Sequence, residues 1–251
     1  MNEAQTPELT GKIALVTGAA GGLGAATSRA LSAAGARVVV SDLAEEVGRE
    51  LAKEIGGEFI RCDVSRLEDN HAMVEFALEC CGGLDLVHLN AGVATGCGVG
   101  EDFELDKYRR AMGANLDGVI FGTHAVLPAL RARGGGAIVA TASLAGLTAV
   151  PMDAIYAANK HAVVGLARSL GPLYEADGIR FNAICPGFSE SAIIDEIREG
   201  LAAEGVPIIP AEQVADTVVH LLGSERSGEC WFVQAGREAA AFEFRGIPGP
   251  R

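Results

Sequence analysis

The stretch "KIALVTGAAGGLGAATSRALSAAG", residues 12–35, joins a short apolar run to a helical pattern through a glycine-rich turn. The apolar run contains branched residues and ends at a glycine, which is typical of a buried parallel strand. The helical pattern closes on Gly35, and glycine is common just beyond a helix C-terminus. A strand, a tight turn and a helix in this order predict the first unit of a parallel α/β sheet.

The same alternation continues along the whole chain. Seven apolar runs, six of which end in Gly, Asp or Ser, are interpreted as strands, at residues 12–18, 36–42, 57–64, 84–92, 136–143, 179–187 and 230–236. Helical patterns lie between them, at residues 22–35, 44–56, 67–82, 107–134 and 156–178. This order predicts one doubly wound, seven-stranded, mostly parallel sheet with helices on both faces. No Pro-rich, Ser-rich or charged linker interrupts it, so we expect residues 1–251 to form a single domain.

The composition narrows the classes of partner. Hydrophobic residues make up 49% of the chain and charged residues 21%, which indicates a compact globular protein. With 33 acidic and 20 basic residues, the formal net charge is -13. No cluster of Lys and Arg offsets this charge, so nucleic acid is not expected as a partner, and a substrate with several negative charges is disfavoured. A small molecule is the expected partner.

The cysteines and the N-terminus point to one compartment. The six cysteines lack the spacing of a metal site, so no metal is expected and the thiols are expected to be reduced. The N-terminal segment has no apolar core of a signal peptide, and no stretch approaches the roughly 18 apolar residues of a membrane span. Both observations favour a cytoplasmic protein with no membrane contact.

The glycine-rich turn is the first candidate site. In "TGAAGGLG", residues 17–24, Gly18, Gly22 and Gly24 allow a tight turn and close approach to a pyrophosphate. The N–H groups at the start of the next helix, around Leu23, would face that anion. A dinucleotide site is therefore predicted, although a tight turn that binds nothing would also need glycine.

Asp42 ends the second strand, 18 residues after Gly24. An acidic side chain at this position can accept hydrogen bonds from the adenosine ribose hydroxyls and would repel a 2'-phosphate. Neither the glycine turn nor Leu43 supplies a cation that would neutralise such a phosphate, so NAD is favoured over NADP. Asp42 can also cap the helix that begins near Ala44, and the two roles are compatible.

From about Lys12 to Gly236 the chain resembles the short-chain dehydrogenase/reductase family. The resemblance rests on the glycine turn, "CDV" at 62–64, "NAG" at 90–92, "PG" at 186–187, and Asn115, Ser143, Tyr156 and Lys160 in the family's order. It implies a Rossmann-type fold and an NAD-dependent oxidoreductase. It further implies cofactor contacts from Asp63, Val64, Asn90, Ala91, Gly92, Tyr156, Lys160, Pro186 and Gly187.

The resemblance also implies a reaction. Tyr156 would remove the alcohol proton while a hydride passes to the nicotinamide, and Ser143 would hold the substrate oxygen. Tyr156 and Lys160 lie one helical turn apart, so the lysine cation would lower the pKa of the phenol from its usual value near 10. Lys160 would also hold the nicotinamide ribose, and Asn115 would anchor a water that relays protons to it.

Some positions depart from the family pattern. Leu89 stands where the family has a first asparagine, and His88 occupies a strand position that is usually apolar, where we expect a packed histidine without a partner. Ser191 stands where the family often has a threonine that contacts the carboxamide. Residues 188–210 contain one short amphipathic helix and resemble the family's substrate lid. Expected substrate-lining residues are mostly apolar: Ala94, Ser143, Leu144, Val150, Met152, Phe188 and Ile193.

The expected function is hydride transfer between NAD(H) and a small to medium, mostly apolar secondary alcohol or ketone. One alternative is an NADP-dependent ketoreductase for carrier-bound acyl chains, against which Asp42 and the net charge count. Another is an NAD-binding sensor or scaffold without turnover, against which the complete set of candidate catalytic residues counts. Similar enzymes are mostly tetramers, so a homotetramer or homodimer is expected. The C-terminal extension, residues 237–251, carries Phe242 and Phe244, which would seek either their own sheet edge or a neighbouring subunit. We expect the extension to cross a subunit interface.

Overall fold

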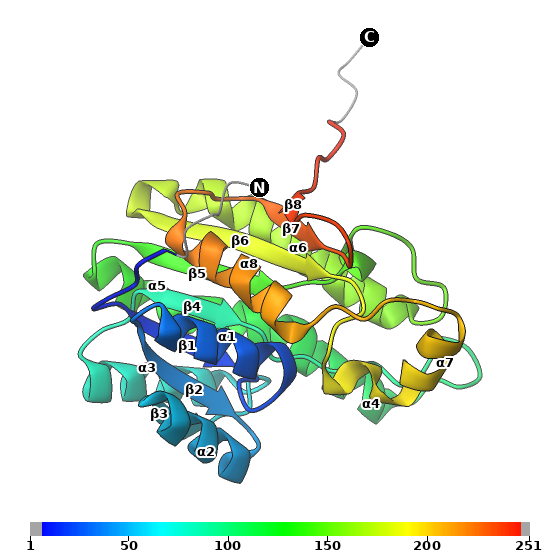
Figure 1. Cartoon of the computed structure of the whole chain (residues 1–251), viewed down its shortest axis with the longest axis horizontal. Helices are drawn as coiled ribbons and strands as arrows, with labels where there is room; N and C mark the ends of the chain where they lie inside the picture. The colour runs from blue at the N-terminus through cyan, green and yellow to red at the C-terminus, as the bar shows by residue number, and fades with distance from the viewer. Residues whose placement is uncertain (1–6, 247–251) are drawn as a thin grey trace.

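The protein is described here by a computed structural model over residues 7–246. Within these residues the chain forms one eight-stranded sheet in the order β3-β2-β1-β4-β5-β6-β7-β8 (Figure 1). The strands are β1 Ile13–Thr17, β2 Arg37–Asp42, β3 Glu58–Arg61, β4 Leu86–Leu89, β5 Gly136–Thr141, β6 Ile179–Pro186, β7 Cys230–Val233 and β8 Ala240–Ala241. All neighbouring pairs are parallel except β7 and β8. The sequence prediction of a doubly wound, mostly parallel sheet is confirmed.

Helices cover both faces of the sheet. The α-helices are α1 Gly22–Ala33, α2 Glu45–Ile55, α3 Leu67–Cys81, α4 Leu105–Met112, α5 Gly118–Ala132, α6 Ala154–Leu173, α7 Arg198–Ala203 and α8 Ala211–Gly223. One apolar core lies under α1, α2 and α8, and the other lies under α3, α5 and α6. On β1, Ala14 and Val16 face the first core while Ile13 and Leu15 face the second. Burial on both faces explains why the strands appear as continuous apolar runs.

The eighth strand was not predicted. Ala240–Ala241 pairs antiparallel with β7, and the N–H of Phe242 donates to the backbone oxygen of Cys230 at 2.7 Å. The ring of Phe244 lies under the guanidinium of Arg168, 3.9 Å from it. Residues 240–244 therefore pack on their own sheet edge and their own α6. Phe242 nevertheless stays 38% exposed, so the expectation that the extension crosses a subunit interface stays a prediction. Residues 247–251 lie outside the described residues.

Two predicted helices are divided. The pattern at residues 107–134 becomes α4, a π-helical segment Gly113–Asp117, and α5. The single helix expected within residues 188–210 becomes a 3₁₀ segment Ala192–Ile197 followed by α7. Two further short 3₁₀ segments follow β5 and α6, at Leu144–Gly146 and Glu175–Asp177. Figure 1 shows α4 and α7 toward the same end of the sheet, the end at which we place the site.

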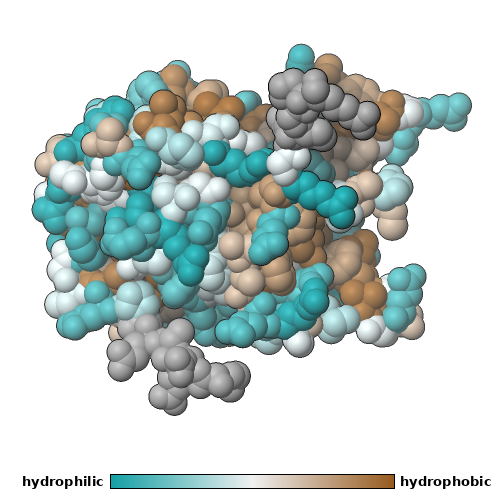
Figure 2. Space-filling model, turned by 90° about the horizontal axis from the view of Figure 1, so that it is seen from above, coloured by the Kyte–Doolittle hydropathy of each residue, from teal (hydrophilic) through white to brown (hydrophobic). Residues whose placement is uncertain are grey.

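The surface and the thiols agree with a globular protein. All six cysteines carry free thiols, of which Cys62, Cys185 and Cys230 are buried. Cys80 and Cys81 end α3, and Gly82 closes that helix in the left-handed conformation with φ 82°. Among residues 7–246, no helix combines the length and the apolarity needed to cross a bilayer. Viewed from the side of α6 and β7, the surface carries patches of hydrophobic residues among hydrophilic ones (Figure 2).

Candidate functional site

The glycine turn between β1 and α1 has the geometry that its sequence predicts. Gly18 has φ 61°, and a Cβ there would lie 2.7 Å from Cα of Ala91. A Cβ on Gly24 would lie 2.1 Å from the backbone oxygen of Gly18, so α1 packs closely on the turn. The N-cap residue Gly21 has no side chain to accept hydrogen bonds from the first N–H groups of α1. These N–H groups, including that of Leu23, suit an anion such as a pyrophosphate.

Asp42 connects the glycine turn to the start of α2. Its carboxylate accepts the N–H of Ala20 at 2.8 Å and the N–H of Ala44 at 2.9 Å. The side chain therefore fixes the glycine turn and the segment that enters α2. It does not form the expected cap, because the N-cap of α2 is Ala44 and no side chain caps this helix. Each oxygen keeps a lone pair for a further donor, so a diol could still bind to this carboxylate. On the neighbouring strand, Arg61 pairs in register with Asp42.

Asn90 ties β4 to the glycine turn. Its Nδ2 donates to the backbone oxygens of Thr17 and Gly18 at 3.2 and 3.1 Å. Its own N–H donates to the hydroxyl of Thr17 at 2.9 Å. Asn90 and Ala91 thus hold the turn in place, which agrees with the supporting role that the resemblance implies.

The "CDV" residues mainly organise their own turn. Asp63 accepts the N–H and the hydroxyl of Ser65 at 3.0 and 2.7 Å. Val64 is buried, and a Cβ on Gly118 would lie 2.8 Å from its Cγ2, so this side chain packs in the core. Contacts of Asp63 and Val64 with an adenine therefore remain a prediction.

Ser143, Tyr156 and Lys160 converge where β5 meets α6. Asp153 is the N-cap of α6, and its carboxylate accepts the N–H of Tyr156 at 2.9 Å, which places Tyr156 in the first turn of the helix. A Cβ on Gly146 would lie 2.5 Å from the backbone oxygen of Lys160, so the segment after Ser143 packs tightly on α6. Nζ of Lys160 lies 5.5 Å from the centroid of the Tyr156 ring, on the face that the sequence spacing predicts.

The hydroxyl of Ser143 has both a donor and an acceptor role. It accepts the N–H of Ala145 at 3.1 Å and donates to the backbone oxygen of Pro186 at 3.4 Å. The second bond is long, so this proton is available to a better acceptor. Gly187 donates to the backbone oxygen of Val233 at 2.9 Å, which fixes the segment after β6 beside Ser143.

The pKa values of Tyr156 and Lys160 in the chain differ from those expected from the sequence. Burial raises the pKa of Tyr156 to about 12; a hydrogen bond with Ser143 opposes this rise, and the carboxylate of Asp153 adds to it. Burial also lowers the pKa of Lys160 to about 8, because the low-dielectric interior disfavours its charge. In the chain without a cofactor, Lys160 therefore does not lower the pKa of Tyr156 below its usual value, and the joint effect of Lys160 and the oxidised nicotinamide stays a prediction. Without a further cation, Tyr156 is a protonated phenol at neutral pH.

Asn115 lies beside Lys160 in the π-helical segment. A Cβ on Gly92 would lie 3.0 Å from Oδ1 of Asn115 and 3.6 Å from Nζ of Lys160. The Asn115 side chain accepts the N–H of Val93 at 2.8 Å and donates to the backbone oxygen of Val93 at 2.9 Å. Its amide is therefore occupied by the backbone after β4. Because Ala91 touches the glycine turn and Gly92 touches this group, the "NAG" segment connects the two halves of the site.

Thr141 is a contributor that the sequence analysis missed. Its backbone oxygen accepts from Nζ of Lys160 at 2.7 Å, and its hydroxyl donates to Oδ1 of Asn90 at 3.1 Å. The same hydroxyl lies 2.9 Å from Nε2 of His88, so His88 has a partner that was not expected. Burial lowers the pKa of His88 to about 3, and the ring is neutral. A threonine at a strand end carries no sequence signal for this role, whereas Asp153 could have been found as a helix cap.

The expected substrate-lining residues differ in exposure. Met152 is 93% exposed and Phe188 is 44% exposed, while Ile193 is half-buried. The two ends of residues 188–210 are joined by backbone hydrogen bonds. The N–H of Ile209 donates to the backbone oxygen of Phe188 at 2.8 Å, and the N–H of Glu190 donates to the backbone oxygen of Ile209 at 3.0 Å. Ser191 reaches the glycine turn, where a Cβ on Gly22 would lie 3.1 Å from its Cα and Cβ.

Comparison with known proteins agrees with this arrangement. The family described as short chain dehydrogenase matches residues 12–202. A cyclohexanol dehydrogenase from Acinetobacter sp. is 36% identical over 238 residues, covering 90% of this chain and 94% of that protein. A 3beta-hydroxysteroid dehydrogenase from Eggerthella lenta is 34% identical, covering 96% of this chain and 91% of that protein. A crystal structure of a short-chain type dehydrogenase/reductase from Mycobacterium marinum aligns with a TM-score of 0.85 at 27% identity, covering 91% of this chain and 96% of that one.

Proposed function

Because this chain belongs to the short-chain dehydrogenase/reductase family, we propose that it transfers a hydride between NAD(H) and a small to medium, mostly apolar secondary alcohol or ketone. Membership itself makes it an oxidoreductase of CH–OH groups that uses a nicotinamide cofactor. The observation that carries the finer proposal is the meeting of Ser143, Tyr156 and Lys160 beside a segment that also touches the glycine turn.

The residues of the chain supply the proton chemistry. Ser143 holds the substrate oxygen, because the bond that its hydroxyl donates to the backbone oxygen of Pro186 is long and is easily exchanged for a better acceptor. In reduction, the protonated phenol of Tyr156 donates its proton to the oxygen of the carbonyl substrate. In oxidation, Tyr156 must first lose that proton. A positive charge that arrives with the cofactor would lower the pKa of the phenol and so favour this loss. The bound nicotinamide supplies the hydride acceptor or donor.

The glycine turn fits the cofactor. The uncapped N–H groups of α1 and the absence of side chains at Gly18, Gly22 and Gly24 leave a cradle for a pyrophosphate. Ser191 borders the cradle on the other side and is proposed to contact the carboxamide, while Lys160 is proposed to hold the nicotinamide ribose. Asn115 is proposed to relay protons to Lys160 through a water at its backbone oxygen, since its side-chain amide is occupied.

Asp42 supports NAD over NADP. Its carboxylate keeps lone pairs for ribose hydroxyls and would repel a 2'-phosphate. Glu45 and Glu46 follow in the first turn of α2, which adds negative charge near that position. A cation, Arg61 of β3, pairs in register with Asp42 of β2 and is the residue there that a 2'-phosphate could use. The proposed substrate class is supported by the apolar candidates Leu144, Met152, Phe188 and Ile193, and by the alcohols named for the two relatives above.

The test is turnover measured by reduced-nicotinamide absorbance with a panel of cyclic secondary alcohols. Wild type is expected to turn over with NAD, and Tyr156→Phe is expected to lose at least about 100-fold in kcat while still binding NAD, because only the proton-transfer group is removed. Tyr174→Phe is the matched control, since Tyr174 stacks with Arg131 away from the site. Unchanged turnover in Tyr156→Phe would remove Tyr156 from its role. A higher kcat/KM with NADP than with NAD would contradict the proposal for Asp42.

The organisation of the chain is also proposed. We place residues 1–251 in a single domain, with residues 188–210 as the substrate lid and residues 237–251 as the C-terminal extension. We further propose a homotetramer or homodimer built on α5 and α6, supported by Ile120 of α5, which is 42% exposed.

A further inference from the structure

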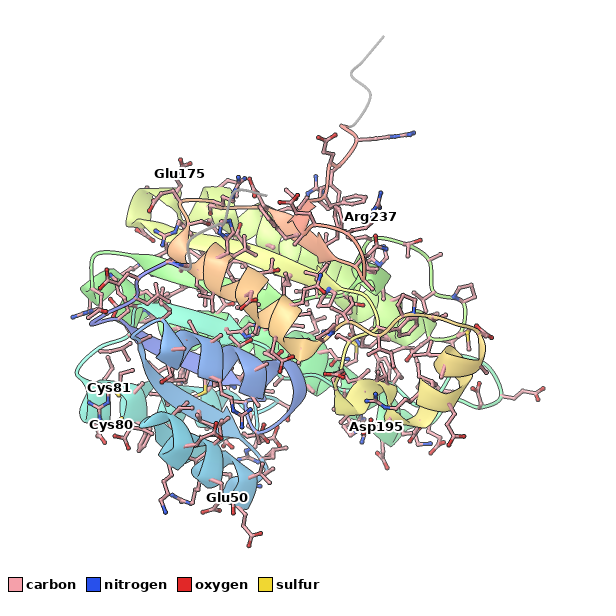
Figure 3. The ribbon with its side chains drawn as sticks, in the orientation of Figure 1. Glu50, Cys80, Cys81, Glu175, Asp195 and Arg237 are labelled. Atoms are coloured by element: carbon pink, nitrogen blue, oxygen red, sulfur yellow. The ribbon has the colours of Figure 1, made fainter. Side chains whose placement is uncertain are left out.

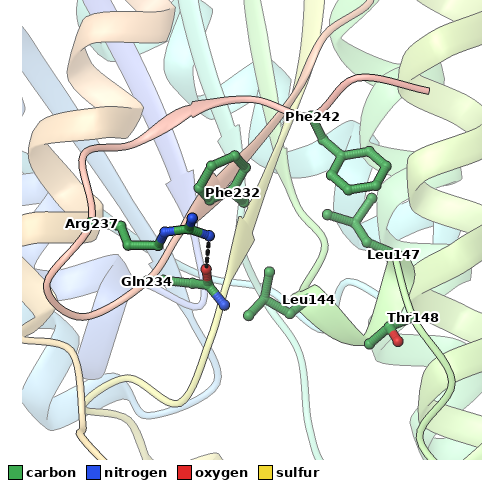
Figure 4. Close-up of a pocket in the computed structure, with 7 residues that line it drawn as sticks. All are labelled: Leu144, Leu147, Thr148, Phe232, Gln234, Arg237 and Phe242. Atoms are coloured by element: carbon green, nitrogen blue, oxygen red, sulfur yellow. Dashed lines mark hydrogen bonds between the residues drawn. The ribbon is translucent and has the colours of Figure 1, made fainter. Parts of the chain in front are cut away.

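A pocket of about 250 Å³ lies between the segment after Ser143 and the end of β7. Its lining comes from two parts of the chain that are distant in sequence, as Figure 4 shows: Leu144, Leu147 and Thr148 on one side, and Phe232, Gln234, Arg237 and Phe242 on the other. Pockets that enclose a whole drug-sized ligand begin at roughly 300 Å³. This pocket therefore suits one end of a ligand rather than all of it.

The pocket adjoins the proposed reaction site. Leu144 directly follows Ser143, whose hydroxyl is proposed to hold the substrate oxygen. A Cβ on Gly187 would lie 3.3 Å from Cδ1 of Leu144, so this side chain, which lines the pocket, also packs beside the segment after β6. In Figure 3, Arg237 is labelled on the upper side and Asp195 of the lid on the lower side of the molecule, and both lie to the right of Cys80 and Cys81. A substrate held at Ser143 can thus extend past Leu144 into the pocket.

The mostly apolar lining of the pocket includes one cationic side chain, that of Arg237. The guanidinium of Arg237 makes one side-chain hydrogen bond within residues 7–246, to Oε1 of Gln234 at 3.4 Å. No carboxylate among these residues comes within ion-pair distance of it. In a chain with a formal net charge of -13, an arginine facing a pocket without an acidic partner is free to bind an external anion.

The charge and shape of the site select the anion. A guanidinium matches a carboxylate with two parallel hydrogen bonds, and one arginine balances one negative charge. A phosphate or a second carboxylate would meet the negative field of the whole chain without a second cation in the lining. The aromatic rings of Phe232 and Phe242 favour an apolar ring or chain next to the charge.

We propose that the substrate is an apolar secondary alcohol, or the corresponding ketone, that carries a single carboxylate at the end remote from the reacting carbon, and that Arg237 binds this carboxylate. The inference rests on the proposed function, since it names the substrate class of the same site. It assigns to the C-terminal extension a role in specificity within its own chain.

The test compares hydroxycyclohexanecarboxylates, with the hydroxyl on ring carbon 3 or 4, and 4-hydroxycyclohexylacetate with their neutral methyl esters. Wild type is expected to prefer the acids, and Arg237→Gln is expected to lower kcat/KM for the best acid about tenfold through KM, with the ester unchanged. Arg237→Lys should retain part of the preference. Lys53→Gln is the matched control, because it removes one exposed positive charge on α2 and should leave the ratio of acid to ester unchanged.

A second measurement separates this proposal from the proposed function. Calorimetric binding of cyclohexanecarboxylate, which cannot be oxidised at an alcohol carbon, should weaken about tenfold in Arg237→Gln even if no alcohol is turned over. An acid-to-ester ratio that Arg237→Gln leaves within twofold across the whole series overturns the proposal. A change of assembly mass in Arg237→Gln without a change of that ratio also overturns it, and would make the pocket a contact between copies of the chain.

Discussion

The side chain of Lys160 is a buried cation with 2% of its surface exposed. Burial lowers its pKa from 10.5 to about 8, so the folded state carries a cost for the charge at pH 7. We expect Lys160→Met to abolish turnover and yet raise the free energy of unfolding of the cofactor-free protein at pH 7 by about 2 kcal/mol. Denaturant unfolding, monitored by circular dichroism, measures this difference.

The sign of the pH dependence follows from proton binding. Between pH 8 and 10.5 the unfolded lysine is protonated while the folded one is not, so unfolding takes up a proton. Stability contributed by this site therefore rises with pH through that window. The advantage of Lys160→Met should shrink between pH 8 and 10.5, whereas Lys53→Met on the exposed face of α2 should show no such trend. A variant that is less stable than wild type at pH 7 would contradict a burial cost at Lys160.

The sequence predicted which residues meet but not their protonation. The four-residue spacing of Tyr156 and Lys160 was enough to place both on one helix face, and the lysine Nζ does lie 5.5 Å from the ring. The pKa shifts of both residues depend first on burial, and that of Tyr156 also on Ser143 and on the carboxylate of Asp153. Burial is set by the packing of the whole fold, so no local pattern reports it.

At the scale of elements, the turn between β1 and α1 depends on close backbone packing. A Cβ at Gly24 would lie 2.1 Å from the backbone oxygen of Gly18, whereas a Cβ at Gly21 would meet nothing within 4 Å. We expect Gly24→Ala to lose about 2 kcal/mol or more of stability, and Gly21→Ala to stay within about 0.5 kcal/mol of wild type. Thermal unfolding of both variants without cofactor measures this. Equal melting temperatures would show that α1 can move away from the turn at little cost.

Two elements that the sequence did not predict, β8 and the π-helical segment, share a cause. The strands β1 to β7 were predicted because each is an apolar run bounded by turn residues. The runs are apolar because helices cover both faces of the sheet. Ala240–Ala241 has no strand propensity and becomes β8 only because the edge of β7 offers unpaired backbone groups. The π-helical segment around Asn115 depends on hydrogen bonds with Val93, a residue from a different part of the chain. Both are consequences of tertiary contacts.

At the scale of the whole molecule, α5 bears on the proposed assembly. Ile120 is 42% exposed, and His124 one turn later is also exposed, so this face of α5 carries apolar surface without a partner within residues 7–246. On α6, the exposed positions Ala158 and Gly165 are small, which would let a neighbouring helix approach closely. Within residues 7–246, α6 is the longest helix, and α5 and α3 share the second-longest length.

We expect Ile120→Asp to lower the assembled mass measured by sedimentation equilibrium, because a charge at a packed interface is not solvated. The subunit fold should persist, since the side chain is already partly exposed in the single chain and tolerates a polar replacement there. Val47→Asp is the matched control: Val47 is 51% exposed on α2, on the opposite face of the sheet, and its replacement should leave the mass unchanged. An Ile120→Asp variant that keeps the wild-type mass would place the interface elsewhere, and a wild-type chain that sediments as a monomer would remove the proposal of assembly altogether.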